Sequence, residues 1–243
     1  MSLNQINEDF NDVFETFFPK MNPVKGRFLG YVNRFVRKAL SWRRNFFKGK
    51  IFISERIVEY PVILRWLRSQ GKVLDIGCVS SRLPMQLASM GYEVYGIDVR
   101  DYPLHHPNFH FQKTDLFLWK PDKKFDAIIL LSALEHFGLG AYGDMKEEDA
   151  DKKAIQLITQ WLNPHGQLLV SVPFGKYGIT KKHRVYDLSR LQNTFSNFEW
   201  VKEAYFIRNN DHWSPCAKEA LKNMESPSLP PNGVAILDLK LKG

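Results

Sequence analysis

The sequence predicts an α/β protein whose open, doubly wound sheet is mostly parallel, with an antiparallel last strand and a helical amino-terminal extension. From residue 71 on, short apolar runs alternate with helical patterns, which is typical of parallel strands joined by crossover helices. The last two apolar runs have no long helix between them, so we expect the final strand to run antiparallel at an edge of the sheet. We therefore divide the chain into a helical, basic extension or lid over residues 1–70 and an α/β domain over residues 71–243.

Local patterns place the individual elements. Residues 125–132 (FDAIILLS) form the strongest strand pattern, because a parallel strand that is covered on both faces needs apolar residues on both. Gly91 is expected to end the first helix of the domain, and Asn163, Pro164 and Gly166 the second. Strands are expected at residues 72–78, 92–99, 109–116, 125–132, 167–172, 198–208 and 234–241, and helices at 80–90, 147–162 and 188–195.

The composition indicates in which cellular compartment the protein is expected. The chain has 243 residues, of which 44% are hydrophobic, so it can bury a core without disulfide bonds. Its two cysteines, Cys78 and Cys216, favour a reducing compartment. No apolar run reaches the roughly 18 residues of a transmembrane helix, and the acidic amino terminus is unlike a signal peptide. We expect a cytoplasmic protein.

The net charge of +8 comes from one segment. Ten of the 34 Lys and Arg lie between residues 16 and 54 with no Asp or Glu among them, so the other 24 nearly balance the 26 acids. Within this segment, residues 27–48 read as an amphipathic helix. It is interpreted as a lid over a substrate site, as a contact to an anionic membrane surface, which would make the protein peripheral there, or as a contact to nucleic acid. No RNA-binding motif supports the last, so a nucleic-acid partner is not expected.

The loops after the first and second strands suggest a nucleoside site, because open parallel sheets bind ligands at the carboxyl ends of their strands. Gly77 allows a sharp turn, and Asp98 follows 21 residues later, where a carboxylate accepts hydrogen bonds from ribose hydroxyls. Val79 and Arg82 stand where a dinucleotide site has glycines, which argues against NAD or FAD. Asp75 suits a cationic ligand such as S-adenosylmethionine. Alternatively, Asp75 and Gly77 only shape the turn.

Four segments in order, VLDIGC, GIDV, KTDL and FDAIILLSALEHFG, resemble the class I S-adenosylmethionine-dependent methyltransferases over about residues 72–175. The resemblance implies a Rossmann-like fold and S-adenosylmethionine as cofactor. The loop Gly77–Ser81 departs from the usual Gly-x-Gly-x-Gly, which leaves open a non-catalytic module that keeps the nucleoside-binding fold and serves as a membrane or partner adaptor. The cofactor-binding residues that the resemblance implies are Asp75, Gly77, Cys78, Asp98, Val99, Asp115, Leu116 and Ser132.

Glu135 and His136, after the fourth strand, are the candidate catalytic residues. A neutral histidine there would take a proton from an acceptor hydroxyl, since its pKa lies near working pH. In the competing interpretation, Glu135 caps the loop and His136 packs against the cofactor. Gly138, Gly140 and Gly143 suggest a mobile loop, with Tyr142 as a substrate contact.

The acceptor is expected to be small and anionic. The segments GLGAYGD, PFG and HRVYD are similar to a branch of methyltransferase-like proteins often associated with surface polysaccharide synthesis, which points to a glycan or nucleotide-sugar derivative. Lys182, His183 and Arg184 lie in a basic loop that would bind phosphate or carboxylate, unless it is only a solvated surface. No metal is predicted, because His105, His106 and His110 lack a companion metal-binding motif.

Overall fold

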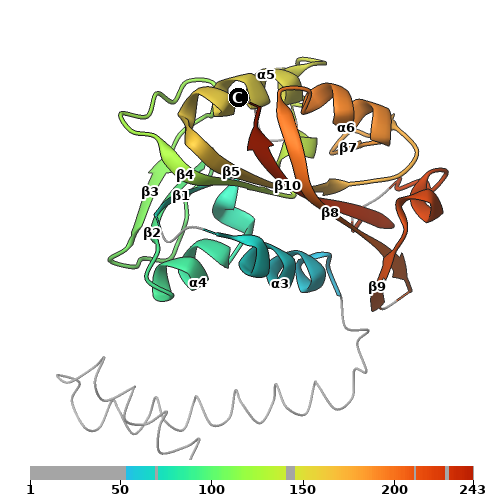
Figure 1. The fold of residues 1–243 in the computed structure, drawn as a ribbon, viewed down its shortest axis with the longest axis horizontal. Helices are drawn as coiled ribbons and strands as arrows, with labels where there is room; N and C mark the ends of the chain where they lie inside the picture. The colour runs from blue at the N-terminus through green and yellow to red at the C-terminus, as the bar shows by residue number, and fades with distance from the viewer. Residues whose placement is uncertain (1–52, 69–70, 141–145, 211, 228–229, 243) are drawn as a thin grey trace, which may run out of the picture. The chain divides into compact units, whose positions relative to one another are not determined.

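The computed structural model describes residues 53–68, 71–140, 146–210, 212–227 and 230–242 (Figure 1). The chain divides into two compact units, residues 1–51 and residues 52–243, and all described elements belong to the second. The amphipathic helix expected over residues 27–48, with its three interpretations, lies outside the described residues.

An eight-stranded sheet forms the centre of the domain, in the order β3-β2-β1-β4-β5-β10-β8-β9. The first five strands in this order are parallel to one another, and β10 pairs antiparallel with both β5 and β8. A separate two-stranded hairpin joins β6 (Gly178–Ile179) to β7 (Arg184–Val185). The strands of the main sheet are β1 (Lys72–Ile76), β2 (Glu93–Asp98), β3 (Phe109–Lys113), β4 (Phe125–Leu131), β5 (Leu162–Pro173), β8 (Phe198–Asn209), β9 (His212–Cys216) and β10 (Gly233–Leu241).

The predicted strands are confirmed, and the last strand is antiparallel as expected. Its position differs, because β10 lies between β5 and β8 and not at the edge of the sheet. Its residues from Val234 to Asp238 are all buried, as in a strand that is paired on both sides. The edge strand beside β8 is β9, which the sequence analysis missed, and Pro215 within it is typical of an edge strand.

Helices cover both faces of the sheet (Figure 1). The helices α3 (Arg56–Trp66) and α4 (Leu83–Ser89) pack on one face, and α5 (Ala150–Trp161) and α6 (Leu188–Thr194) on the other. Side chains alternate along β4 between the two layers: Ile129 packs with α3 and α4, whereas Ile128 packs with α5. The connections over residues 99–108 and 114–124 contain no α-helix.

The structure confirms Gly91 as the end of α4, but Asn163, Pro164 and Gly166 do not end α5 as expected, because β5 already begins at Leu162. Gly91, with a φ of 92°, follows α4, and the Tyr92 amide donates to the Leu87 carbonyl at 3.1 Å, which completes a Schellman motif. At α6, the Asp187 carboxylate caps the first turn by accepting from the Arg190 amide at 2.7 Å.

The helix α3 belongs to the domain, although the sequence analysis assigned residues 1–70 to an extension. Glu59 in α3 is fully buried and accepts hydrogen bonds from Ser132 and Ser171, which follow β4 and lie in β5. These bonds fasten α3 to the sheet, so the unit begins at residue 52 and not at residue 71.

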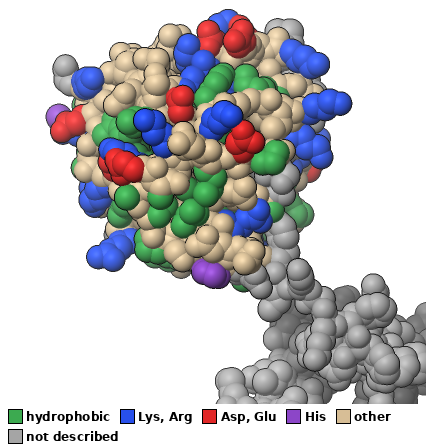
Figure 2. Space-filling model, turned by 90° about the vertical axis from the view of Figure 1, so that its right-hand side faces the viewer, with side chains coloured by type: hydrophobic (Ala, Val, Ile, Leu, Met, Phe, Trp, Pro, Cys, Tyr) green, Lys and Arg blue, Asp and Glu red, His purple; other side chains and the backbone are tan. Residues whose placement is uncertain are grey.

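The described surface carries both signs of charge. Figure 2, which views the domain from the β8–β9 side, shows Lys and Arg interspersed with Asp and Glu and with several small apolar patches. None of the described helices is both long enough and apolar enough to cross a bilayer.

Candidate functional site

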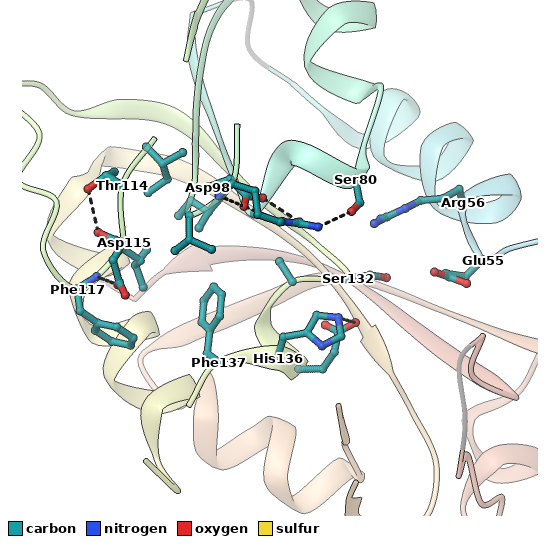
Figure 3. A pocket seen from close by; sticks show the side chains of 18 residues that line it. Glu55, Arg56, Ser80, Asp98, Thr114, Asp115, Phe117, Ser132, His136 and Phe137 are labelled. Carbon is teal, nitrogen blue, oxygen red and sulfur yellow. Dashed lines mark hydrogen bonds and ion pairs between the residues drawn. The ribbon is translucent and has the colours of Figure 1, made fainter. Parts of the chain in front are cut away.

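A cavity of about 270 Å³ opens at the carboxyl ends of the central strands. Its walls are formed by the residues that follow β1, β2, β3 and β4 and by the start of α3 (Figure 3). The strand order reverses at β1, because β2 lies on one side of β1 in the sheet and β4 lies on the other. The cavity therefore lies where an open parallel sheet binds its ligands.

The loop after β1 forms one wall of the cavity. Gly77 has a φ of 76°, and a Cβ added to it would lie 2.7 Å from the Cβ of Ala133. No non-glycine residue can take its place without strain. The next residues form the 3₁₀ turn η1 (Cys78–Ser80), and Ser81 is extended with a φ of −118°. Only Gly77 in this loop has a positive φ, so the serines that replace the usual glycines are compatible with the turn.

Asp98 lies at the end of β2 and lines the cavity, followed by Val99 and Arg100. Its Oδ1 accepts from the Arg100 amide at 2.9 Å and from Arg100 Nε at 3.1 Å. Its Oδ2 accepts from the Val79 amide at 3.0 Å and from Arg100 Nη2 at 3.1 Å. The Asp98 carboxylate is thus held by a guanidinium that also donates to Ser80 Oγ (Figure 3).

Two residues expected to touch the cofactor lie beneath the cavity. Asp75 and Cys78 do not line it, and both are buried. The reason is local geometry: Asp75 points to the α4 face of β1, and Cys78 Sγ packs against Gly96, where an added Cβ would lie 2.9 Å away. Burial raises the pKa of Asp75 to about 7 although Arg56 opposes the shift, and burial also raises the pKa of the Cys78 thiol. Both Asp75 oxygens have no hydrogen-bond partner among the described residues.

Leu116, Phe117 and Phe137 make the far end of the cavity largely apolar. Asp115 lines it, and its Oδ1 accepts from the Phe117 amide at 2.8 Å. Leu116, Phe117 and Phe137 lie beside it, and the two phenylalanine rings are 6.5 Å apart in an edge-on arrangement. Figure 3 shows Asp115 and Phe117 at the opposite end from Glu55 and Arg56. Phe117, Phe137 and Arg100 were not predicted from the sequence.

A buried network at the end of β4 joins α3 to the cavity wall. Ser132 has a φ of 45°, which is unusual for a residue other than glycine. Its Oγ donates to Glu59 Oε1 at 2.6 Å, and Arg56 Nη1 pairs with Glu59 Oε2 at 2.9 Å. Arg56 also donates to the Leu131 carbonyl at 3.0 Å. Sequence reasoning missed Glu55, Arg56 and Glu59, because nothing local marks a helix of the extension as part of this site.

Glu135 and His136, the predicted catalytic residues, both line the cavity. They lie in the 3₁₀ turn η2 (Leu134–His136). Because a carbonyl only accepts, His136 Nδ1 donates to the Lys182 carbonyl at 2.5 Å, and Nε2 lies 3.8 Å from Glu135 Oε1. Burial lowers the pKa of His136, and burial together with Glu59 raises the pKa of Glu135 well above its ordinary value. The histidine is therefore held neutral, with its Nδ1 protonated.

The basic loop does not form the expected anion site. Arg184 is fully buried and donates to the carbonyls of Phe137 and Glu148, at 3.4 Å and 3.1 Å. His183 is buried and bonded to Thr180 and to the Ser226 carbonyl. Lys182 is exposed, but neither it nor its two neighbours line the cavity. All three side chains were expected at a substrate, but Arg184 instead bonds to the carbonyls of Phe137 and Glu148, and His183 bonds to Thr180 and to the Ser226 carbonyl. Tyr142 lies outside the described residues.

The strand order, the antiparallel β10 and the position of the cavity define the Rossmann-like fold of the class I S-adenosylmethionine-dependent methyltransferases. Solved structures similar to the chain include the N-methyltransferase NodS from Bradyrhizobium japonicum WM9 in complex with S-adenosyl-L-homocysteine. It is 13% identical, with 77% of this chain and 87% of that chain covered and a TM-score of 0.54.

A second structure is the 1,6-didemethyltoxoflavin-N1-methyltransferase from Burkholderia thailandensis with bound 1,6-didemethyltoxoflavin and S-adenosylhomocysteine. It is 14% identical over 93% of this chain and 92% of that chain, with a TM-score of 0.57. A third is the [4+2]-cyclase SpnF, 16% identical over 80% and 85% of the two chains, with a TM-score of 0.54. Residues 117–226 also match the family described as "Caenorhabditis protein of unknown function, DUF268". No curated protein matches the chain.

Proposed function

We propose that the protein is an S-adenosylmethionine-dependent methyltransferase that acts on a small-molecule acceptor. The observation that carries this proposal is the meeting of Gly77, Asp98 and Asp115 in one cavity that also contains Glu135 and His136. Methyltransferases with this fold that were crystallised with S-adenosylhomocysteine agree with it.

The residues present fit this cofactor. Gly77 lines the cavity in a turn that packs against Ala133 too closely for any side chain, and two residues earlier both oxygens of the buried Asp75 carboxyl have no hydrogen-bond partner among the described residues. Asp98 would hold the ribose hydroxyls, and Asp115 with Leu116 and the two phenylalanines would hold the adenine. Phe117 and Phe137 extend the predicted adenine site with aromatic surface. When bound, the cofactor supplies an electrophilic methyl group on a sulfonium.

The chain itself contributes orientation and proton transfer. The Lys182 carbonyl fixes the tautomer of His136, so that its Nε2 is the basic nitrogen beside Glu135. A neutral imidazole with a lowered pKa takes a proton from an acceptor as the methyl group arrives. Glu59, which pairs with Arg56, accepts from Ser132 and so fixes the start of the loop that carries Glu135 and His136. A fixed loop would keep these two side chains in position for an acceptor.

The finer expectations for the acceptor have less support. A glycan or nucleotide-sugar acceptor was inferred partly from Lys182, His183 and Arg184, two of which are buried and bonded within the fold. A membrane contact through residues 27–48 and a cytoplasmic location remain predictions.

A competing proposal is a non-catalytic module with the same fold. The observation that favours it is that the Arg100 side chain already donates two hydrogen bonds to the Asp98 carboxylate, to which the ribose hydroxyls would bind.

Calorimetric titration with S-adenosylmethionine and S-adenosylhomocysteine separates the two proposals. A methyltransferase should bind both, and Asp98→Ala should weaken both at least tenfold, about 1.4 kcal/mol, because two ribose hydroxyls lose their acceptor. Lack of binding by the wild-type protein would favour the non-catalytic module. Equal affinity in a folded Asp98→Ala variant would rule out the ribose assignment.

A further inference from the structure

The cationic side chains that line the cavity already have anionic partners. Arg56 pairs with Glu59 and donates to the Leu131 carbonyl, and Arg100 pairs with Asp98. These contacts leave the guanidinium charges balanced by the protein itself. An anionic acceptor would have to compete with these carboxylates.

Two acidic side chains that line the same cavity, Glu135 and Glu55, each keep one carboxyl oxygen without a hydrogen-bond partner among the described residues. Glu135 is 1% exposed and lines the cavity, and its Oε2 has no hydrogen-bond partner among the described residues. Glu55 also lines the cavity, and its Oε2 is buried and equally unpartnered there. Buried polar atoms in native proteins are nearly always hydrogen-bonded, so two orphaned carboxyl oxygens in one cavity indicate a ligand with several donors.

We propose that the acceptor is a primary or secondary amine whose nitrogen binds against Glu135 and His136. The proposal rests on the proposed methyltransferase function and names the substrate class of that same site. Glu135 Oε1 lies 3.8 Å from His136 Nε2, so one nitrogen atom can contact both side chains. An ammonium group offers two or three donors, whereas an alcohol offers one and a carboxylate none.

The chemistry balances with groups already in the site. The ammonium gives one proton to His136 Nε2 and so exposes its lone pair. That lone pair forms the N–C bond to the methyl group, while the S–C bond breaks and its electrons stay on sulfur. Sulfur changes from a sulfonium to a neutral thioether, and the product leaves as a methylated ammonium. The proton on His136 then passes to solvent.

Glu135 could instead contact the methyl donor, because S-adenosylmethionine is itself a sulfonium cation. If Glu135 served the sulfonium, its removal would weaken binding of S-adenosylmethionine but not of neutral S-adenosylhomocysteine. If it serves an amine acceptor, both cofactor affinities stay unchanged.

The experiment uses the full chain saturated with S-adenosylhomocysteine. The probes are small ring and chain skeletons, each supplied as a primary amine, an alcohol and a carboxylate, with affinities measured by calorimetry. We expect amines to bind at least tenfold more tightly than their matched alcohols and carboxylates. Glu135→Gln should remove this preference and change the affinity for S-adenosylhomocysteine less than twofold. The control is Glu199→Gln, an exposed glutamate of β8 outside the cavity.

The proposal is overturned if no amine exceeds its alcohol or carboxylate, or if Glu135→Gln leaves the preference intact. It is also overturned if the variant weakens only S-adenosylmethionine. Should Glu135→Gln fail to fold, the wild-type protein still decides, because its affinities for the matched amines, alcohols and carboxylates are measured without any variant. Amines that bind no more tightly than their matched alcohols and carboxylates contradict the proposal. Failure of the proposed function is separate, since it appears as absent binding of both cofactor forms.

Discussion

Replacing Arg100 with alanine should tighten cofactor binding, although it removes a side chain from the binding cavity. A carboxylate offers about four acceptor positions, and all four on Asp98 are filled in the free protein. The two backbone amides are fixed by their loops, so ribose hydroxyls must displace the two bonds from the Arg100 side chain, each 3.1 Å long. This side chain is 41% exposed, so solvent screens the pair and its displacement costs about 1 kcal/mol. Arg100→Ala should therefore bind S-adenosylhomocysteine about fivefold more tightly.

Calorimetry with neutral S-adenosylhomocysteine is the appropriate assay, since it avoids the change in charge repulsion that a sulfonium would feel. Arg82→Ala is the matched control, because Arg82 is exposed near the same turn and does not line the cavity. In an Asp98→Ala background the gain from Arg100→Ala should vanish, as a double-mutant cycle would show. Weaker binding by Arg100→Ala would refute the reasoning and make Arg100 a direct contact of the cofactor.

Two further variants test the loop and the buried acid. Gly77→Ala should lower the free energy of unfolding by about 1–3 kcal/mol in urea titrations, because Gly77 has a positive φ and an added Cβ would meet Ala133. Gly178→Ala is the control, since a Cβ added there meets open space. Equal effects of the two variants would contradict this prediction. Asp75 ionises near 3.8 when unfolded and at about 7 when folded, so the unfolded state loses its proton first and stability falls as pH rises through this window. Asp75→Asn should remove that fall, on the order of 4 kcal/mol between pH 4 and 8, and parallel stability curves for variant and wild type would disprove it.

Much of the fold was predictable because local sequence patterns specify its strands and the end of α4. The run at 125–132 is apolar at every position that β4 buries, and Gly91 marks the end of α4 by its conformation alone. Asp98 and Asp115 were also predictable, since their place at strand ends sets their position in the cavity.

Other parts of the site depend on partners far away in the chain. Glu59 reaches Ser171 across 112 positions, and no local pattern announces that contact. Arg184 looked like a surface cation because charge alone does not reveal burial, and its acceptors are backbone carbonyls that only the folded chain brings together. Arg100 stands two residues beyond Asp98, yet its pairing depends on which rotamer the loop after β1 permits.

The insertion of β10 between β5 and β8 determines the order in which the domain can be completed during synthesis. A growing chain that has passed Asn209 but has not reached Gly233 presents two strand edges that nothing yet pairs. Such edges attract other chains, and β5 is apolar along most of its length. Both edges become paired only when residues 233–241 form β10 between β5 and β8, so these residues must leave the ribosome before the sheet is protected from aggregation. A chain that stops before Gly233 should therefore aggregate more readily than the full chain, because β5 and β8 both lose their pairing with β10.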